Sequence, residues 1–216
     1  MKAIIFLALI IAITSYKVKG IDLSGWDTTV HWDKLKKEVD FVILRAGLGN
    51  NQSDKVYESY YKKCKEHELP VGAYWFGKAT TVKQAENEAN YFIQRLKGKK
   101  FEYPVYYDIE YEKMVETGKE NVSKMLAKFC TVLEKHKYYC GVYANKSTLE
   151  SKFTSEVLKK YDIWLAHYTS KTSYKGHKIW QYTESGRLDG KPGDCDLNWS
   201  YFDYPTLIKS KHFNGY

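Results

Sequence analysis

The sequence predicts an α/β fold, an irregular TIM-like barrel with about five βα units plus three closing strands. As far as residue 145, short apolar runs alternate with amphipathic stretches, which is typical of strands and helices that alternate around a parallel sheet. Beyond residue 145, three strand-like runs are separated by gaps too short for a crossover helix. No internal repeat or low-complexity linker interrupts the chain, so a single domain is expected over residues 21–216.

Eight short apolar runs are expected to be strands. Residues that fit a pleated surface dominate them, and Gly, Pro or polar residues bound most of them. Gly47 and Gly49 end the second run, and Pro70 and Gly72 mark the start of the third. In chain order, the runs cover residues 20–24, 41–46, 71–76, 103–110, 139–145, 163–168, 179–182 and 195–198.

Three helices are expected between these runs, at residues 57–67, 82–96 and 120–136. In each of them, apolar side chains recur every three or four residues and therefore share one helix face. The recurring positions are Tyr57, Tyr60, Tyr61 and Cys64 in the first helix, Ala85, Ala89, Phe92, Ile93 and Leu96 in the second, and Val122, Met125, Leu126, Phe129 and Leu133 in the third.

Residues 1–20 are expected to be a cleaved secretory signal peptide. Lys2 precedes an apolar run at residues 3–13, which is shorter than the roughly 20 residues that span a bilayer. Cleavage is expected between about residues 15 and 20, and an uncleaved anchor is the alternative. The protein would then be secreted, or delivered to a lysosome or digestive vacuole. No later segment is apolar enough for membrane insertion.

Cysteines and charge narrow the class further. Cys64, Cys130, Cys140 and Cys195 suggest two disulfides in a secreted chain, and all three pairings stay open. No metal-ligand spacing occurs, so no metal or cofactor is expected. The net charge of +8 suits an anionic polymer such as a bacterial wall, whereas the absence of a basic cluster argues against nucleic acid. Without a long apolar surface stripe, a monomer is expected.

Two acids give the strongest indication of chemistry. Asp108 and Glu110 end the run 103–110, and at a spacing of two residues both side chains leave the same face of a strand. Paired carboxylates perturb each other's proton affinity, which suits acid–base chemistry. No Lys or Arg lies between Glu102 and Glu112, so a structural ion pair within this run does not explain the acids. A solvated loop start is the alternative, since the acidic run continues at Glu112.

Asp22 and Asp196 are expected to join this pair. They lie on the first and last predicted strands, which are neighbours in a closed barrel. Chemistry on TIM-type barrels sits at the carboxyl ends of the strands, where all four acids would then converge.

Seven short motifs follow one another along the chain. They are Ile21-Asp-Leu-Ser24, Phe41-Val-Ile-Leu-Arg-Ala-Gly47, Val71-Gly-Ala-Tyr-Trp-Phe76, Pro104-Val-Tyr-Tyr-Asp-Ile-Glu110, Ile163-Trp-Leu-Ala-His-Tyr168, Ile179-Trp-Gln-Tyr182 and Asp196-Leu-Asn198. In this order they resemble glycoside hydrolase family 25, the lysozymes of the Chalaropsis type, over residues from about 20 to 205. The resemblance implies an incomplete (β/α) barrel that hydrolyses the β-1,4 bond between N-acetylmuramic acid and N-acetylglucosamine in peptidoglycan.

The resemblance also implies roles for the four acids. Glu110 corresponds to the general acid that protonates the leaving oxygen. Asp108 corresponds to an assisting carboxylate, which either orients the N-acetyl group of the substrate or acts as nucleophile or electrostatic partner. Asp22 and Asp196 are expected to support this pair by binding sugar hydroxyls, with a capping or turn carboxylate as the alternative.

Four further residues near the same barrel end are candidate sugar contacts, because aromatic rings stack on pyranose faces and amides bond hydroxyls. They are Tyr74, Tyr143, Trp164 and Gln181, each with a core position as the alternative. Two departures from the family bear on substrate preference. His31-Trp32 stands where members often have Asp-Trp, and Tyr74-Trp75-Phe76 where many have Tyr-His-Phe.

Two rival functions are weighed against a lysozyme that kills or digests bacteria. A chitinase-like N-acetylglucosaminidase would carry a longer DxxDxDxE run, which is absent here. A secreted wall-binding lectin that has lost catalysis would lack one of the acids, and all four are present.

Overall fold

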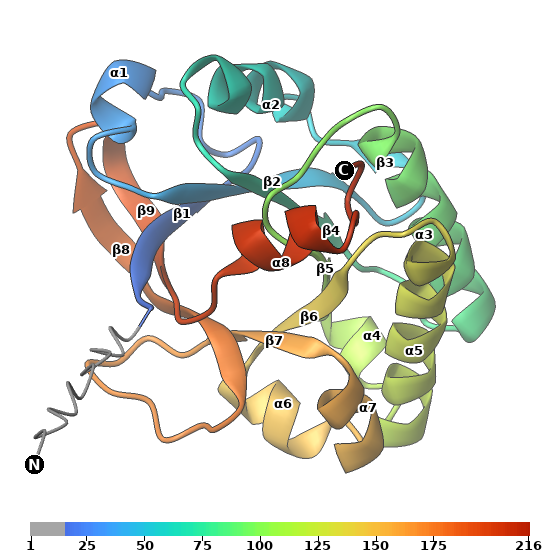
Figure 1. The fold of residues 1–216 in the computed structure, drawn as a ribbon. Helices are drawn as coiled ribbons and strands as arrows, with labels where there is room; N and C mark the ends of the chain where they lie inside the picture. The colour runs from blue at the N-terminus through green and yellow to red at the C-terminus, as the bar shows by residue number, and fades with distance from the viewer. Residues whose placement is uncertain (1–15) are drawn as a thin grey trace, which may run out of the picture.

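Eight strands close into a barrel in the computed structural model, which describes residues 16–216 (Figure 1). The ring order is β1-β9-β8-β7-β6-β5-β4-β2, and β1 also pairs with β2. The barrel strands are β1 (Val18–Leu23), β2 (Phe41–Leu48), β4 (Val71–Phe76), β5 (Val105–Asp108), β6 (Cys140–Asn145), β7 (Asp162–Ala166), β8 (His177–Leu188) and β9 (Lys191–Ser200). A short β3 (Gln52–Ser53) pairs with β2 only. The predicted irregular TIM-like barrel is thus confirmed.

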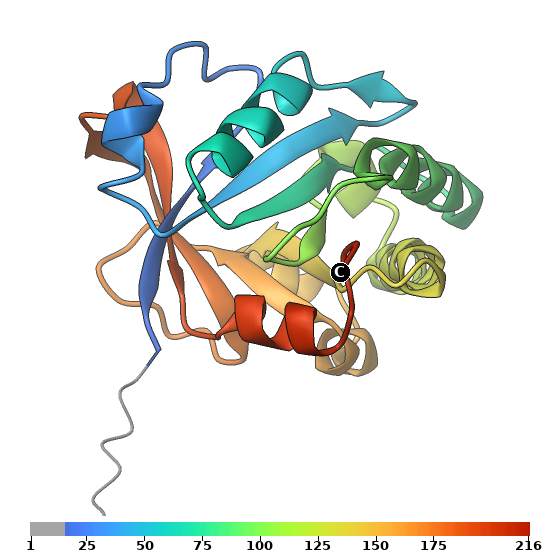
Figure 2. The same ribbon diagram turned by 45° about the horizontal axis from the view of Figure 1, so that its top comes forward.

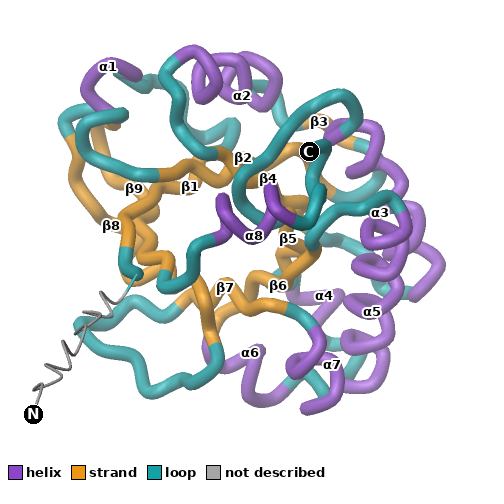
Figure 3. The backbone as a smooth tube through the Cα atoms, viewed as in Figure 1, coloured by secondary structure: helices purple, strands orange, loops and turns teal. Residues whose placement is uncertain are grey.

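Helices lie around the ring of strands, and α8 lies across it, as the tube in Figure 3 shows. The three long helices were predicted and are confirmed, whereas the five short ones were missed, because four to seven residues are too few to show a helical period. The helices are α1 (Trp32–Leu35), α2 (Tyr57–Glu66), α3 (Val82–Leu96), α4 (Glu112–Val115), α5 (Lys119–Lys135), α6 (Lys146–Ser151), α7 (Ser155–Lys160) and α8 (Tyr204–Ser210).

The closing strands differ in detail from the expectation. β7 and β8 are parallel, although no helix crosses between them, and β9 runs antiparallel to both β8 and β1. β8 and β9 extend well beyond the predicted cores into a long hairpin, whose tip docks on α1 through Gly190 O, which accepts from His31 N. The outer half of this hairpin was missed because its residues are mostly polar and it contains register shifts.

Aromatic side chains fill the inside of the barrel. The Trp164 ring lies 4.6 Å from the ring of Tyr143, 5.2 Å from that of Tyr106 and 5.8 Å from that of Tyr74, measured between centroids. Tyr204 of α8 belongs to the same buried cluster, so that α8 covers the amino-terminal end of the barrel (Figure 2). The interior is therefore packed solid at one end, and a cleft has room only at the other.

The outer core lies between the sheet and the helices. Successive side chains of a strand point to opposite faces, so Tyr107 faces outward where Tyr106 faces inward. The Tyr107 ring stacks on Phe129 of α5 at 3.7 Å, and Phe92 of α3 packs against Phe129 at 6.1 Å. The Tyr107 hydroxyl donates to the buried Glu88 of α3 at 2.6 Å. These contacts fix α3 and α5 on β5, the strand that ends in Asp108.

The predicted signal peptide falls mostly on residues 1–15, which lie outside the described residues. Val18 and Lys19 already belong to β1, where they pair with Ser200 and Trp199. We therefore propose that any cleavage occurs near residue 15, because cleavage after Gly20 would remove paired residues of the barrel. Within residues 16–216, no helix is long and apolar enough to cross a membrane.

One disulfide joins Cys130 near the end of α5 to Cys140 at the start of β6. This link belongs to one of the three pairings that the sequence left open. The second expected disulfide is absent, and Cys64 and Cys195 are free and buried. Cys64 lies on α2, which packs on β2 and β4, whereas Cys195 lies on β9, so the two thiols belong to different parts of the fold.

Replacing both Cys130 and Cys140 by Ala is expected to lower the free energy of unfolding by about 2–3 kcal/mol, because the unfolded chain regains the entropy of a closed loop. Urea unfolding of the variant and of the reduced parent measures the loss. Reductant should leave the double variant unchanged. A parent protein whose stability does not respond to reductant would contradict the expectation.

Candidate active site

A cleft of about 230 Å³ opens at the carboxyl-terminal end of the barrel. All eight residues predicted for the site line it, and their individual roles stay predictions. Four further residues that the sequence reasoning did not assign to the site also line it. The twelve are Asp22, Asp108, Glu110, Asp196, Tyr74, Tyr143, Trp164, Gln181, Ser24, Trp26, Arg45 and Phe76.

Strand register brings the four acids together. Asp108 is the last residue of β5, and Glu110 follows two residues later at the mouth of the cleft, where it remains accessible to solvent. Asp22 on β1 and Asp196 on β9 are direct partners across an antiparallel pair. The expected approach of first and last strands is therefore confirmed, and it results from β1 pairing with β9.

Two amides hold Asp22 in place. Asp22 Oδ2 accepts hydrogen bonds from Gln181 Nε2 at 2.9 Å and from Asn198 Nδ2 at 2.8 Å. Asn198 Oδ1 in turn accepts from the indole nitrogen of Trp164 at 2.7 Å. Asn198 is fully buried. Asn198 lies two residues after Asp196, so the same-face rule that paired Asp108 with Glu110 could have identified it.

Gln181 is a positioning residue as much as a wall of the cleft. Its Oε1 accepts from the hydroxyls of Tyr143 at 2.8 Å and Tyr168 at 2.9 Å, while its nitrogen donates to Asp22. The side-chain oxygen of Gln181 and one hydrogen of its amide nitrogen are therefore already hydrogen-bonded to protein groups. Tyr168 lies beyond the end of β7, and the sequence reasoning did not name it for the site.

The pair Asp22 and Asp196 binds protons more readily than ordinary carboxyls. Burial raises the pKa of Asp22 well above its usual range, with a further contribution from Asp196, while its bonds to the two amides act in the opposite direction. Burial, followed by the charges of Asp27 and Glu184, raises the pKa of Asp196 to about 7. Like charges in a desolvated cleft have this effect.

Asp108 and Glu110 are shifted in the same direction. Burial raises the pKa of Asp108 well above the usual value, with Glu110 and Asp22 adding to the shift. The surrounding protein also raises the pKa of Glu110, while the positive charge of Arg45 opposes both shifts. Desolvation causes the rise in the pKa of Glu110, and the charge of Asp108 is not among its causes. In the free protein, burial disfavours the ionised form of Asp108, which is the form that the expected assisting role would use.

Asp108 also has an unsatisfied oxygen. Its Oδ1 is buried and has no hydrogen-bond partner among the described residues. A buried carboxylate oxygen without a donor is costly, so such atoms mark places where a ligand group is expected to bind. Among residues 16–216, no cluster of three or more His, Cys, Asp or Glu side chains is arranged to hold a metal ion.

Comparison with known proteins agrees with this geometry. The family model for glycosyl hydrolases family 25 matches residues 21–191. An autolytic lysozyme from Clostridium acetobutylicum is 27% identical over 186 residues, which cover 84% of this chain and 55% of the lysozyme. The uncharacterized protein YegX of Escherichia coli strain K12 is 25% identical over 201 residues, which cover 85% of this chain and 70% of YegX.

A solved structure gives the same result for the fold. The modular autolysin LytC from Streptococcus pneumoniae, in complex with a synthetic peptidoglycan ligand, superposes with a TM-score of 0.79 at 27% identity. The match covers 87% of this chain and 47% of LytC. The chain thus spans about half of the length of the lysozyme and of LytC.

Replacing Asp196 by Asn is expected to stabilise the protein at about pH 8 but not at about pH 4. The pKa of Asp196 is about 7 in the folded protein against 3.8 for an ordinary Asp. The ionised side chain therefore lowers the stability of the folded protein above pH 7, and this loss disappears as the pH falls from about 7 to 3.8. We expect a gain of at least about 1 kcal/mol at the higher pH, which corresponds to roughly one pKa unit.

Denaturant unfolding at both pH values measures this gain. Asp189→Asn is the matched control, because Asp189 is exposed at the tip of the β8–β9 hairpin and its removal deletes the same charge without relieving burial. An equal gain in both variants, or a gain for Asp196→Asn that is independent of pH, would contradict the assignment.

Proposed function

The chain belongs to glycosyl hydrolases family 25, and from this premise we propose that it is a muramidase that cleaves the β-1,4 bond between N-acetylmuramic acid and N-acetylglucosamine in bacterial peptidoglycan. The observation that supports this most is the meeting of Asp108 and Glu110 in one aromatic-walled cleft. Glycoside hydrolysis needs a proton donor and a partner for the positive charge at the anomeric carbon.

Glu110 is proposed as the general acid. Its raised pKa keeps the carboxyl protonated to a higher pH than an ordinary Glu, so it has a proton to deliver to the leaving oxygen. Its accessibility in the cleft allows an incoming glycosidic oxygen to reach it. The surroundings of Asp108 differ, because that side chain is almost fully buried at the bottom of the cleft.

Asp108 is proposed to orient the N-acetyl group of the substrate. The unpartnered Oδ1 would accept the amide N–H of that group, which directs the acetamido oxygen at the anomeric carbon. As the acetamido oxygen attacks, positive charge develops on the group, and an ionised Asp108 stabilises it. The positive charge of Arg45, which opposes the rise in the pKa of Asp108, favours this ionised form.

Asp22 and Asp196 are proposed as supporting acids. Asp22 raises the pKa of Asp108 through its charge, so the state of the supporting pair affects the assisting carboxylate. The hydrogen bonds from Gln181 and Asn198 fix the position of Asp22 relative to Asp108. Tyr74, Tyr143 and Trp164 are proposed to form the wall on which sugar rings pack.

The biological setting is proposed from the signal peptide and the net charge. The predicted signal peptide supports secretion, or delivery to a lysosome or digestive vacuole. A monomer is proposed because the sequence has no long apolar surface stripe. The net charge is +8 for the full sequence and stays positive when the signal peptide is removed, which supports attraction to an anionic bacterial wall. Killing of bacteria and digestion of bacteria both fit these features.

Replacing Glu110 by Gln is expected to reduce the release of muramic acid reducing ends from purified peptidoglycan by about 100-fold or more, because the amide cannot donate the acid's proton to the leaving oxygen. Turbidity clearing and sugar-end analysis measure the loss. Glu112→Gln is the matched control, since Glu112 is exposed outside the cleft two residues away. Its activity should remain close to that of the parent.

Other results would point elsewhere. Equal activity in the parent and Glu110→Gln would remove Glu110 from the role of general acid. Binding of peptidoglycan by the parent without new reducing ends would indicate a wall-binding lectin. Digestion of chitin without digestion of peptidoglycan would indicate a chitinase-like enzyme.

A further inference from the structure

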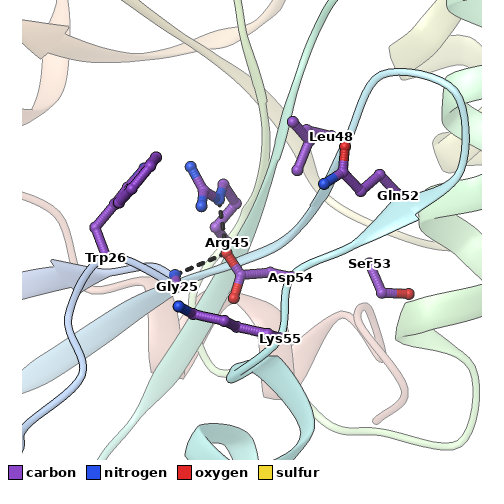
Figure 4. A pocket seen from close by; sticks show the side chains of 8 residues that line it. All are labelled: Gly25, Trp26, Arg45, Leu48, Gln52, Ser53, Asp54 and Lys55. Atoms are coloured by element: carbon purple, nitrogen blue, oxygen red, sulfur yellow. Dashed lines mark hydrogen bonds and ion pairs between the residues drawn. The ribbon is translucent and has the colours of Figure 1, made fainter.

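Figure 4 shows the residues that line a second cavity of about 200 Å³. This cavity shares Trp26 and Arg45 with the acid cleft. Arg45 and Trp26 form the boundary between the two spaces, because both residues line each of them. The remaining side chains of this second cavity include Leu48, Gln52 and Lys55. The catalytic proposal above uses none of these three.

Trp26 is displayed on the surface by a well-fixed loop. Its side chain is 84% exposed, although Trp has the largest apolar surface of any residue. The loop that carries it is tied down, since Gly25 N donates to Asp54 Oδ2 at 2.8 Å and Ser24 N donates to Asp27 Oδ2 at 2.9 Å. An exposed ring on a fixed loop beside a cleft is a ready surface for a ligand.

The charge of this second cavity is positive. Asp54 is buried, and its carboxylate accepts from Arg45 Nε at 2.7 Å, from Gly25 N at 2.8 Å and from Val56 N at 3.0 Å. Arg45 therefore neutralises Asp54. Lys55 is exposed, and no acid of residues 16–216 lies within ion-pair distance of its ammonium group. One positive charge remains in excess, beside a cleft that holds four acids.

We propose that the cavity between Trp26, Arg45 and Lys55 is a subsite for the acidic stem peptide carried by the muramic acid sugar. This inference rests on the proposed function. In peptidoglycan that sugar bears a short peptide with small apolar residues and free carboxylates. Lys55 and the outer nitrogens of Arg45 would bind a carboxylate, and Leu48 and the Trp26 ring would contact the apolar side chains.

The position of Arg45 makes this arrangement workable. A stem carboxylate close to four acids would be repelled unless a cation lay between them. Arg45 lies at that boundary, since it lines both spaces and its charge acts on Asp108 and Glu110. A third neutral sugar is the other candidate occupant, but a sugar would leave the excess positive charge unused.

Two substrates distinguish a stem peptide from a sugar as the occupant. One is glycan strands that carry stem peptides, and the other is the same strands after an amidase has removed the peptides. For the parent, kcat/KM should be higher on the peptide-bearing strands. Lys55→Gln should raise KM for those strands about tenfold, because a charge-assisted bond is lost, with kcat and all constants on stripped strands unchanged. Lys55→Arg should restore the preference.

Lys97→Gln is the control, because it deletes an equal charge at an exposed position at the far end of α3, away from the cleft. This variant should leave kcat and KM unchanged on both substrates. Equal effects of Lys55→Gln on both substrates, or no preference in the parent, would overturn the stem-peptide subsite. Equal effects would instead fit a sugar in the cavity. In that case Trp26→Ala should also raise KM equally for both substrates.

The two proposals fail differently. A parent that cleaves peptide-bearing and stripped strands equally well remains a muramidase and loses only the stem-peptide subsite. A folded parent that releases no muramic acid reducing ends from either substrate fails as a muramidase, and the stem-peptide subsite is then overturned with it.

Discussion

Closure of the barrel through β1 is the constraint on which the site depends. β1 pairs in parallel with β2 and antiparallel with β9, and the second pairing sets Asp22 directly opposite Asp196. The same closure brings the amides of β8 and β9 onto Asp22, because Gln181 and Asn198 both donate to its Oδ2. An open sheet would leave the four acids in two separate groups. The antiparallel β9, which departs from the regular barrel, is therefore what completes the site.

Closure also divides the barrel into a dry end and a polar end. Trp164 packs among tyrosines in the interior, and α8 covers the amino-terminal side. The polar groups on that side are mostly paired, as the hydroxyls of Tyr139 and Tyr204 are with Asp162, because an unpaired buried polar group is costly. At the carboxyl end the indole nitrogen of Trp164 donates to Asn198, which links the apolar packing to the bonds that hold Asp22. The aromatic core thus orients the acids as well as stabilising the fold.

The strands, the long helices and the four acids could be predicted from the sequence because each has a local signal: an apolar run, a helical period, or acids at a strand end. Asn198 could have been found by its two-residue spacing from Asp196, whereas Tyr168 could not be assigned, since its importance comes from Gln181 on another strand. The pairing of cysteines is likewise a matter of tertiary geometry. The even count suggested two disulfides, but the fold brings only Cys130 and Cys140 together.

Arg45 connects the chemistry of the cleft to the recognition of a larger substrate. Its Nε is committed to Asp54, and Asp54 holds the loop that displays Trp26 through Gly25 N. Its charge meanwhile opposes the rise in the pKa of both Asp108 and Glu110. One side chain therefore fixes an exposed aromatic side chain and favours the ionised forms of both acids. An anion bound next to Arg45 would weaken the positive field at these acids, so occupation of the second cavity and the ionisation of Asp108 are coupled through a single guanidinium.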